Sequence, residues 1–317
     1  MKPEHHSRTM EVAADLIDYW SSASPSLPAW LPLQKVKSLV AKAGTKLMAR
    51  WVAQIDALDD VELSSGLLDF LAGWVSKPTC FQHFAYCGYW GDELWKGKAV
   101  IKKYGGYCWD CDQYQRWLEG RAAENWMNVK YNPDCNVLTP AILKGSPGAK
   151  QIPGNIDWDD QVYPSALELA EFYSKAAKKM TPPQQQLNWD IQSLCFGVHL
   201  LQDQGIPHHV LCTVAGGHSH FEEDMYGFWR SYYSERSNTT KDEVIGHQLS
   251  DRVANLLGDQ RLSNAKSFEK IGEWAVDRTG QWLQKAGGIP AIPCAMDSLN
   301  LTVQGIACTI RALALHA

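Results

Sequence analysis

The residues that most constrain the fold of this chain lie between His199 and Glu222. This stretch reads HLLQDQGIPHHVLCTVAGGHSHFE, and it separates His199 from Asp203, and His218 from Glu222, by four positions each. Side chains four positions apart lie on one face of a helix, so each pair can direct two donor atoms to one point. Imidazole and carboxylate are the ligands of zinc sites that use no cysteine. The stretch therefore predicts two halves of a site for several zinc ions.

The context of His199 favours a metal ligand over a structural histidine. A lone histidine on an apolar helix is more often a hydrogen-bonded core residue. Burying Asp203 one turn later without a cation is costly, and a metal ion removes that cost. Pro207 ends the helix and turns the chain, so that His209 can return to the same centre. Adjacent residues do not share a direction, so His208 is an alternative to His209 and only one of them is expected to bind metal.

The rest of the chain has the periodicity of helices and predicts an all-α fold. Neither a β-rich meander nor an alternation of strands and helices is present. Hydrophobic residues make up 45% of the 317 residues, enough for a sizeable core, and this length allows one large domain or two smaller ones. We expect one domain over 1–317. Residues 78–160 are rich in Trp, Tyr, Gly, Cys and Pro, and we expect residues 84–160 to form a long irregular insertion that covers the mouth of the site. We expect helices at 6–20, 33–57, 62–75, 112–128, 163–180, 184–205, 219–234, 240–257, 264–286 and 296–315.

Charge and hydropathy argue against two classes of partner. The formal net charge is −5 without a long basic run, which disfavours a stable nucleic-acid complex held by phosphate neutralisation. No apolar segment is long enough to span a bilayer. The first residues lack the apolar core of a secretory signal, so we expect a cytoplasmic protein if Met1 is the native start. We expect a secreted protein if a signal was removed before Met1. The sequence does not determine the oligomeric state.

The nine cysteines do not form one obvious framework. Cys195, Cys212 and Cys308 have apolar neighbours and are expected to be buried free thiols. Cys108 and Cys111 form C-W-D-C, a spacing used in redox chemistry and in metal binding. Because Cys80, Cys87 and Cys135 lie in the same region, a local disulfide or a structural zinc is the alternative to ordinary thiols.

The order and spacing of the ligand residues resemble the zinc-dependent bacterial phospholipase C family and the related single-strand-specific fungal nucleases. Those proteins share an H-x-x-x-D-x-x-x-P-x-H segment that is followed, after a short loop, by G-H-x-x-x-E. The corresponding residues of this chain are His199, Asp203, Pro207 and His209, and then Gly217, His218 and Glu222. The resemblance implies a multi-helix all-α domain that surrounds a cluster of two to three zinc ions. It covers the helices before and after residues 84–160, but not those residues.

The resemblance also implies an earlier aspartate and histidine, about fourteen residues apart, with an aromatic residue after the histidine. Asp69 and His83, which precedes Phe84, have this spacing. Asp56 and Asp60 are alternatives to Asp69.

A further ligand implied by the resemblance is a histidine that opens the first helix. His6 fits this position and His5 is the alternative. In the family, the amino and carbonyl groups of a mature N-terminal tryptophan bind the third ion. Met1 stands in their place here, and the amino-terminal group at Met1 is therefore a candidate ligand.

On the family's pattern, the ligands fall into three groups. One zinc would be held by Asp69, His83, His199 and Asp203, a second by His209, His218 and Glu222, and a third by His6, the chain terminus at Met1 and a shared Asp203. Asp69 would also act as the catalytic general base. The implied activity is hydrolysis of a small phosphoester by a zinc-bound hydroxide, as in a phospholipase C-like phosphodiesterase. The alternatives are a single-strand nuclease or nucleotidase, a cytoplasmic biosynthetic enzyme that uses the zincs as Lewis acids, and a binding protein with a degenerate metal site.

Overall fold

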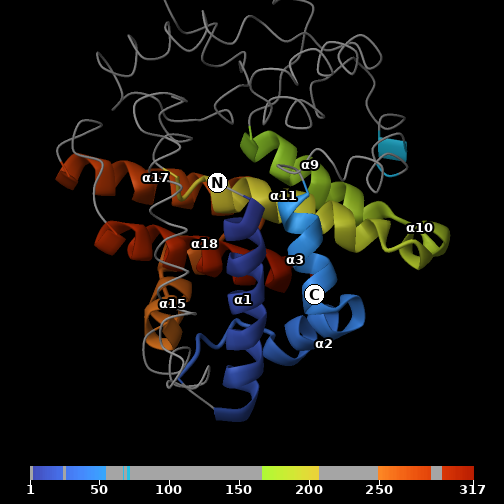
Figure 1. The fold of residues 1–317 in the computed structure, drawn as a ribbon, viewed down its shortest axis with the longest axis horizontal. Coiled ribbons are helices and arrows are strands. Elements are labelled where there is room, and N and C mark those ends of the chain that lie inside the picture. Colours follow the sequence, from blue (N-terminus) through green and yellow to red (C-terminus); the bar gives the residue numbers. More distant parts are fainter. Residues whose placement is uncertain are drawn as a thin grey trace, which may run out of the picture.

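The described part of the protein is entirely helical, as expected for an all-α fold (Figure 1). The computed structural model describes residues 3–23, 26–54, 67, 70–71, 166–206, 249–286 and 295–317, which contain ten helices and no strand. The helices are α1 (Pro3–Ala23), α2 (Leu33–Ala43), α3 (Thr45–Ala53), α9 (Ala166–Lys179), α10 (Pro182–Gln186), α11 (Trp189–Asp203), α15 (Ser250–Leu257), α16 (Gln260–Ser263), α17 (Phe268–Ala286) and α18 (Ala295–His316). Leu67, Phe70 and Leu71 are also helical, within the helix predicted over 62–75.

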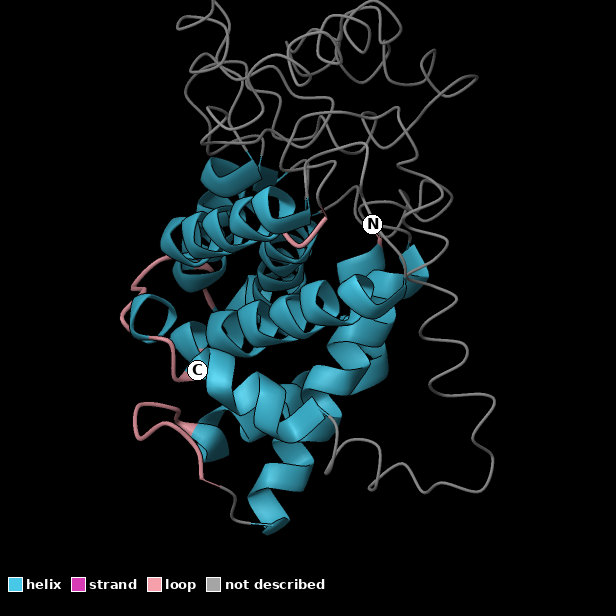
Figure 2. Ribbon diagram, turned by 90° about the vertical axis from the view of Figure 1, so that its left-hand side faces the viewer, coloured by secondary structure: helices cyan, strands magenta, loops and turns pink. Residues whose placement is uncertain are grey.

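Helix α11 is the centre of this fold. Every residue from Asp190 to Asp203 is buried, and the helix packs against α3, α9, α17 and α18 (Figure 1). Figure 2 shows that the described residues form helices joined by loops. Gly197 permits this close packing, because a Cβ atom there would lie 2.9 Å from the Phe268 ring and 3.0 Å from the Ala170 carbonyl oxygen. A helix that is buried on all sides offers its polar side chains no solvent, so they need partners inside the protein.

Helix α1 places its first turn beside α3. Its core face includes Met10, Ala13 and Ile17, which recur at the expected helical period, and His6 lies on the same face one turn before Met10. The hydroxyl of Ser7 donates a hydrogen bond to the Ala49 carbonyl at 3.1 Å, which joins the first turn of α1 to α3. The start of α1 is therefore held in the core.

Two predicted helices are each divided in the structure. The helix predicted over 33–57 is interrupted at Gly44, whose φ of 85° ends α2 while its N–H bonds to the Val40 carbonyl. The helix predicted over 184–205 is α10 followed by α11, with Asn188 between them at a φ of 57°. Glycine and asparagine accept positive φ more readily than other residues, so the chain turns there although the apolar periodicity continues.

The other boundaries agree more closely with the predictions. The stop and restart predicted at Thr181-Pro182-Pro183 is confirmed, and the Gln184 side chain accepts a hydrogen bond from the Thr181 N–H at 3.1 Å. The helix predicted over 264–286 begins later, at Phe268, after the separate short helix α16. Only the end of the helix predicted over 240–257 is described, as α15.

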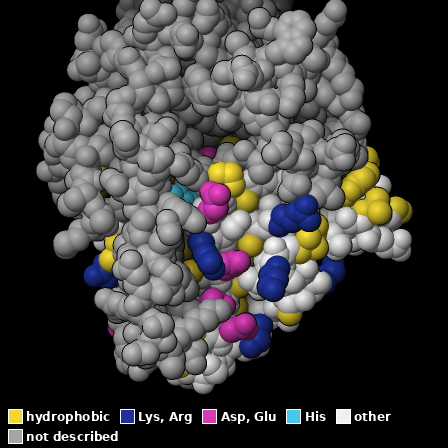
Figure 3. Space-filling model, in the orientation of Figure 1, with side chains coloured by type: hydrophobic (Ala, Val, Ile, Leu, Met, Phe, Trp, Pro, Cys, Tyr) yellow, Lys and Arg dark blue, Asp and Glu magenta, His cyan; other side chains and the backbone are white. Residues whose placement is uncertain are grey.

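The described residues also test the predictions about buried thiols and membrane-spanning segments. Cys195 and Cys308 are buried free thiols, as predicted. None of the described helices has the length and apolarity needed to cross a membrane. On the face drawn in Figure 3, acidic and basic side chains of the described residues are interspersed.

The remaining structural predictions fall on residues outside the described ranges. They concern the insertion at 84–160, the helices at 112–128 and 219–234, the C-W-D-C segment and Cys212.

Candidate metal centre

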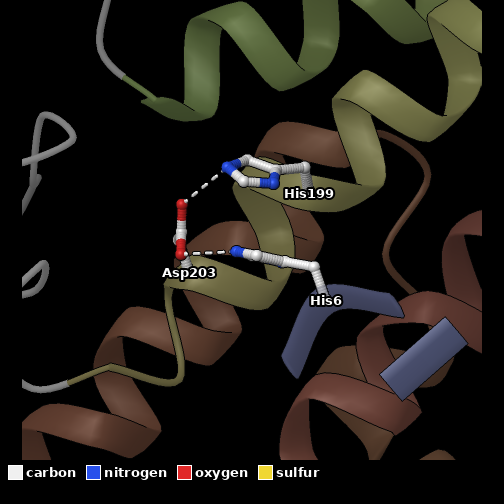
Figure 4. A group of neighbouring side chains, drawn as sticks. All are labelled: His6, His199 and Asp203. Carbon is white, nitrogen blue, oxygen red and sulfur yellow. Dashed lines mark ion pairs between the residues drawn. The ribbon is translucent and has the colours of Figure 1, made fainter. Parts of the chain in front are cut away.

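His6, His199 and Asp203 meet in the interior of the protein (Figure 4). The Nε2 atom of His6 lies 3.3 Å from Oδ1 of Asp203, and Nε2 of His199 lies 3.2 Å from Oδ2. One donor atom from each residue can be chosen so that all three lie within 4.8 Å of one another. None of the three side chains is more than 2% exposed. This group of a carboxylate and two imidazoles could hold a metal ion.

The two helices bring these residues together in different ways. His199 and Asp203 occupy one face of the last turns of α11, so their proximity follows from the helical repeat. His6 comes from the first turn of α1 and reaches them only through packing. Its ring stacks on that of His199, with centroids 3.8 Å apart and planes inclined by 27°. Stacking directs both Nε2 atoms to the same carboxylate (Figure 4).

Hydrogen bonds at the opposite nitrogens determine which ring atom carries the proton. Nδ1 of His199 lies 2.8 Å from the Val52 carbonyl oxygen, which can only accept, so this Nδ1 is protonated. Nδ1 of His6 lies 2.7 Å from Oε1 of Gln202, a carboxamide oxygen that also only accepts. When both rings are neutral, each therefore directs the lone pair of Nε2 to Asp203.

The distances from each Nε2 to its Asp203 oxygen are compatible both with an ion pair and with two ligands of one ion. Imidazolium–carboxylate hydrogen bonds are typically about 2.7–2.9 Å long. Ligand atoms about 2.0–2.1 Å from zinc at tetrahedral angles lie about 3.3–3.4 Å from one another. The observed separations of 3.3 and 3.2 Å are close to the second value. The charge, lone pairs and spacing of these donors are thus compatible with a bound metal ion.

The structure brings three of the predicted ligands together and does not describe the others. Of the two histidines considered for the first helix, His6 joins the group, whereas His5 is buried in the same turn without being part of it. The predicted site residues outside the described ranges are Met1, Asp69, His83, His209, His218 and Glu222.

Sequence reasoning missed two partners of the histidines. Gln202 directly precedes Asp203 on a helix without exposed positions, and a glutamine in such a helix is a usable signal for a buried polar contact. The Val52 carbonyl belongs to the backbone, so no residue type could have indicated its contact with His199.

Comparisons with known proteins did not assign the chain to a family. A scan against protein-family models, a search of curated proteins and a search of solved structures each found no match. A functional interpretation therefore depends on the residues of the site and on the motif resemblance.

Proposed function

We propose that this protein is a zinc-dependent hydrolase of phosphoric esters, similar to phospholipase C. The main support is the buried meeting of His6, His199 and Asp203 at separations expected for zinc ligands. The motif resemblance assigns the same three residues to adjoining zinc ions, although His6 is distant in sequence from His199 and Asp203.

The orientation of Asp203 supports more than one ion. Its Oδ1 faces His6 and its Oδ2 faces His199. A carboxylate shared between two ions would direct one oxygen to each in this way. We therefore expect the two to three zinc ions implied by the resemblance.

The surrounding helices also agree with the proposed family. Helix α9 precedes the ligand helix in sequence, α18 closes the chain, and both pack against α11. The resemblance implies helices at these two positions. In the complete site, Asp69, His83, His209, His218, Glu222 and the terminal group at Met1 would supply the remaining ligands, and residues 84–160 would cover the mouth.

The chemistry assigns separate tasks to the metal and to the protein. Zinc, when bound, supplies Lewis-acid activation of water and of a phosphoryl oxygen. His6 and His199 would hold it through Nε2 while their Nδ1 protons remain bonded to Gln202 and Val52. Burial keeps water from screening the charge of the centre, which strengthens its attraction for a phosphate ester. Asp69 would take the proton from the attacking water.

An elemental metal count combined with two hydrolysis assays tests this function. We expect at least two zinc ions per chain and hydrolysis of a chromogenic choline phosphodiester that is lost on chelation and restored by zinc. His199→Gln should abolish the activity, whereas His316→Gln, which changes a histidine outside the group, should retain it. Full activity of the metal-stripped protein in chelator would refute the proposal. Hydrolysis of single-stranded DNA in preference to the phosphodiester would identify the nuclease alternative, and zinc without either activity would overturn the hydrolase.

A further inference from the structure

Three hydrogen bonds connect His6 to the backbone of α18. Nδ1 of His6 lies 2.7 Å from Oε1 of Gln202, and Nε2 of Gln202 donates to Oγ1 of Thr309 at 3.0 Å. The Thr309 hydroxyl then donates to the Gly305 carbonyl at 2.8 Å. Gln202 and Thr309 are both fully buried. Water therefore does not compete for these bonds, and each group depends on its neighbour.

When the Thr309 hydroxyl bonds to the Gly305 carbonyl, the directions of the other two bonds follow. The Gly305 carbonyl carries no proton, so Thr309 must donate to it. Because the hydroxyl has a single proton, its oxygen can then only accept, and the amide nitrogen of Gln202 must face it. The carboxamide oxygen is thereby turned to His6, whose Nδ1 must donate. The proton of a neutral His6 ring is consequently on Nδ1, and the Nε2 lone pair faces Asp203.

We propose that Gln202, oriented by Thr309, is a positioning residue that selects the metal-binding tautomer of His6. This inference rests on the proposed metal centre and adds to it, because the H-x-x-x-D motif leaves position 202 unspecified. His199 is held differently, by the Val52 carbonyl, which no substitution of a side chain removes. The tautomer of His6 is thus the one that side chains of α11 and α18 control.

This role of Gln202 predicts that replacing Thr309, which contacts neither His6 nor the metal, changes the tautomer of His6. With valine at position 309, the Gln202 amide loses the acceptor that orients it. The carboxamide can then rotate and present its NH₂ group to Nδ1 of His6. That arrangement favours the Nε2–H tautomer and places a proton where the metal should bind.

The fold contains a matched control with the same local chemistry. Thr279 donates to the Gln204 carbonyl at 2.7 Å and accepts from Nε2 of Gln304 at 3.0 Å. Thr279 and Gln304 are as buried as Thr309 and Gln202. Among the described residues, Oε1 of Gln304 has no hydrogen-bond partner, so this pair orients no histidine. Substitutions here should affect packing and stability without altering the metal centre.

The test uses the full chain, with metal removed and then with zinc added. Long-range ¹⁵N NMR of the histidines reports the tautomer of His6, assigned with His6→Gln, and competition with a chromogenic chelator reports zinc affinity. For wild type we expect the Nδ1–H tautomer. Thr309→Val and Gln202→Met should shift the ring towards Nε2–H and weaken zinc binding by about 10–100-fold. Thr309→Ser keeps the hydroxyl and should restore both properties.

Thr279→Val and Gln304→Met should keep the wild-type tautomer and zinc affinity, even where they lower the unfolding temperature. Equal losses of affinity in Thr279→Val and Thr309→Val would show general destabilisation and overturn the proposal. Wild-type tautomer and affinity in both Thr309→Val and Gln202→Met would also overturn it, while the metal centre would stand. A wild-type protein that binds no zinc would instead reject the metal centre, and the positioning role with it.

Discussion

Replacing Asp203 with asparagine distinguishes a metal centre from a buried salt bridge. Asparagine preserves the shape of the side chain but removes the negative charge that faces both Nε2 atoms, at 3.3 and 3.2 Å. Asp203 is only 1% exposed, so solvent cannot compensate for the change. The two alternatives differ in whether the loss of stability depends on zinc.

The expected magnitudes make this difference measurable. Removing one partner of a buried ion pair costs about 3–5 kcal/mol, and this loss would be the same in chelator and in zinc. A metal that binds only the folded state adds about 2.7 kcal/mol when its concentration is 100 times the Kd. For a chain of 317 residues, that corresponds to a rise in Tm of about 4 °C. We expect this rise in wild type at pH 8, and little or none in Asp203→Asn.

Differential scanning calorimetry in chelator and in zinc measures both the zinc-independent loss of stability and the zinc-dependent rise in Tm. Asp190→Asn is the matched control, because Asp190 is a buried carboxylate of the same helix outside the metal group. This control should show the full zinc-dependent rise. Equal zinc-dependent rises in Asp203→Asn and wild type would refute the assignment of Asp203 as a ligand. A loss of stability in Asp203→Asn that is the same in chelator and in zinc, while zinc leaves the Tm of wild type unchanged, would identify a salt bridge between Asp203 and the two histidines.

Three further predictions concern residues outside the centre. Burial lowers the pKa of His316 below its ordinary 6.5, so the unfolded chain binds more protons and stability falls as the pH drops from 6.5 towards the folded-state pKa. His316→Asn should reduce this loss in urea titrations, and an unchanged pH profile would contradict the prediction. Burial also raises the pKa of the Cys195 and Cys308 thiols, so iodoacetamide should leave both unmodified in the native protein and label them after unfolding, as read by peptide mass spectrometry. Rapid native labelling would show that these thiols are accessible. Gly197→Ala should lower the free energy of unfolding by about 1–3 kcal/mol, because its Cβ would overlap the Phe268 ring. An unchanged urea midpoint would show that the two helices can move apart without loss of stability.

Local patterns in the sequence were sufficient to predict the helical class of the described residues and the pairing of His199 with Asp203. Apolar periodicity predicted the helices, and the four-residue spacing placed His199 and Asp203 on one face, because both depend only on the helical repeat. The same periodicity could not reveal the breaks at Gly44 and Asn188. Apolar residues continue on both sides of each break, whereas one positive φ redirects the chain.

Only the tertiary structure decided how His6 enters the group and how its ring is oriented. The helical face of α1 made His6 a core residue, but contact with His199 depends on how α1 packs beside α3. The Gln202–Thr309 chain likewise joins three helices that are distant in sequence. Helical spacing operates over a few residues and can be read along the chain. The direction of a buried hydrogen bond depends on which groups from other helices face it, and these are known only once the helices have packed.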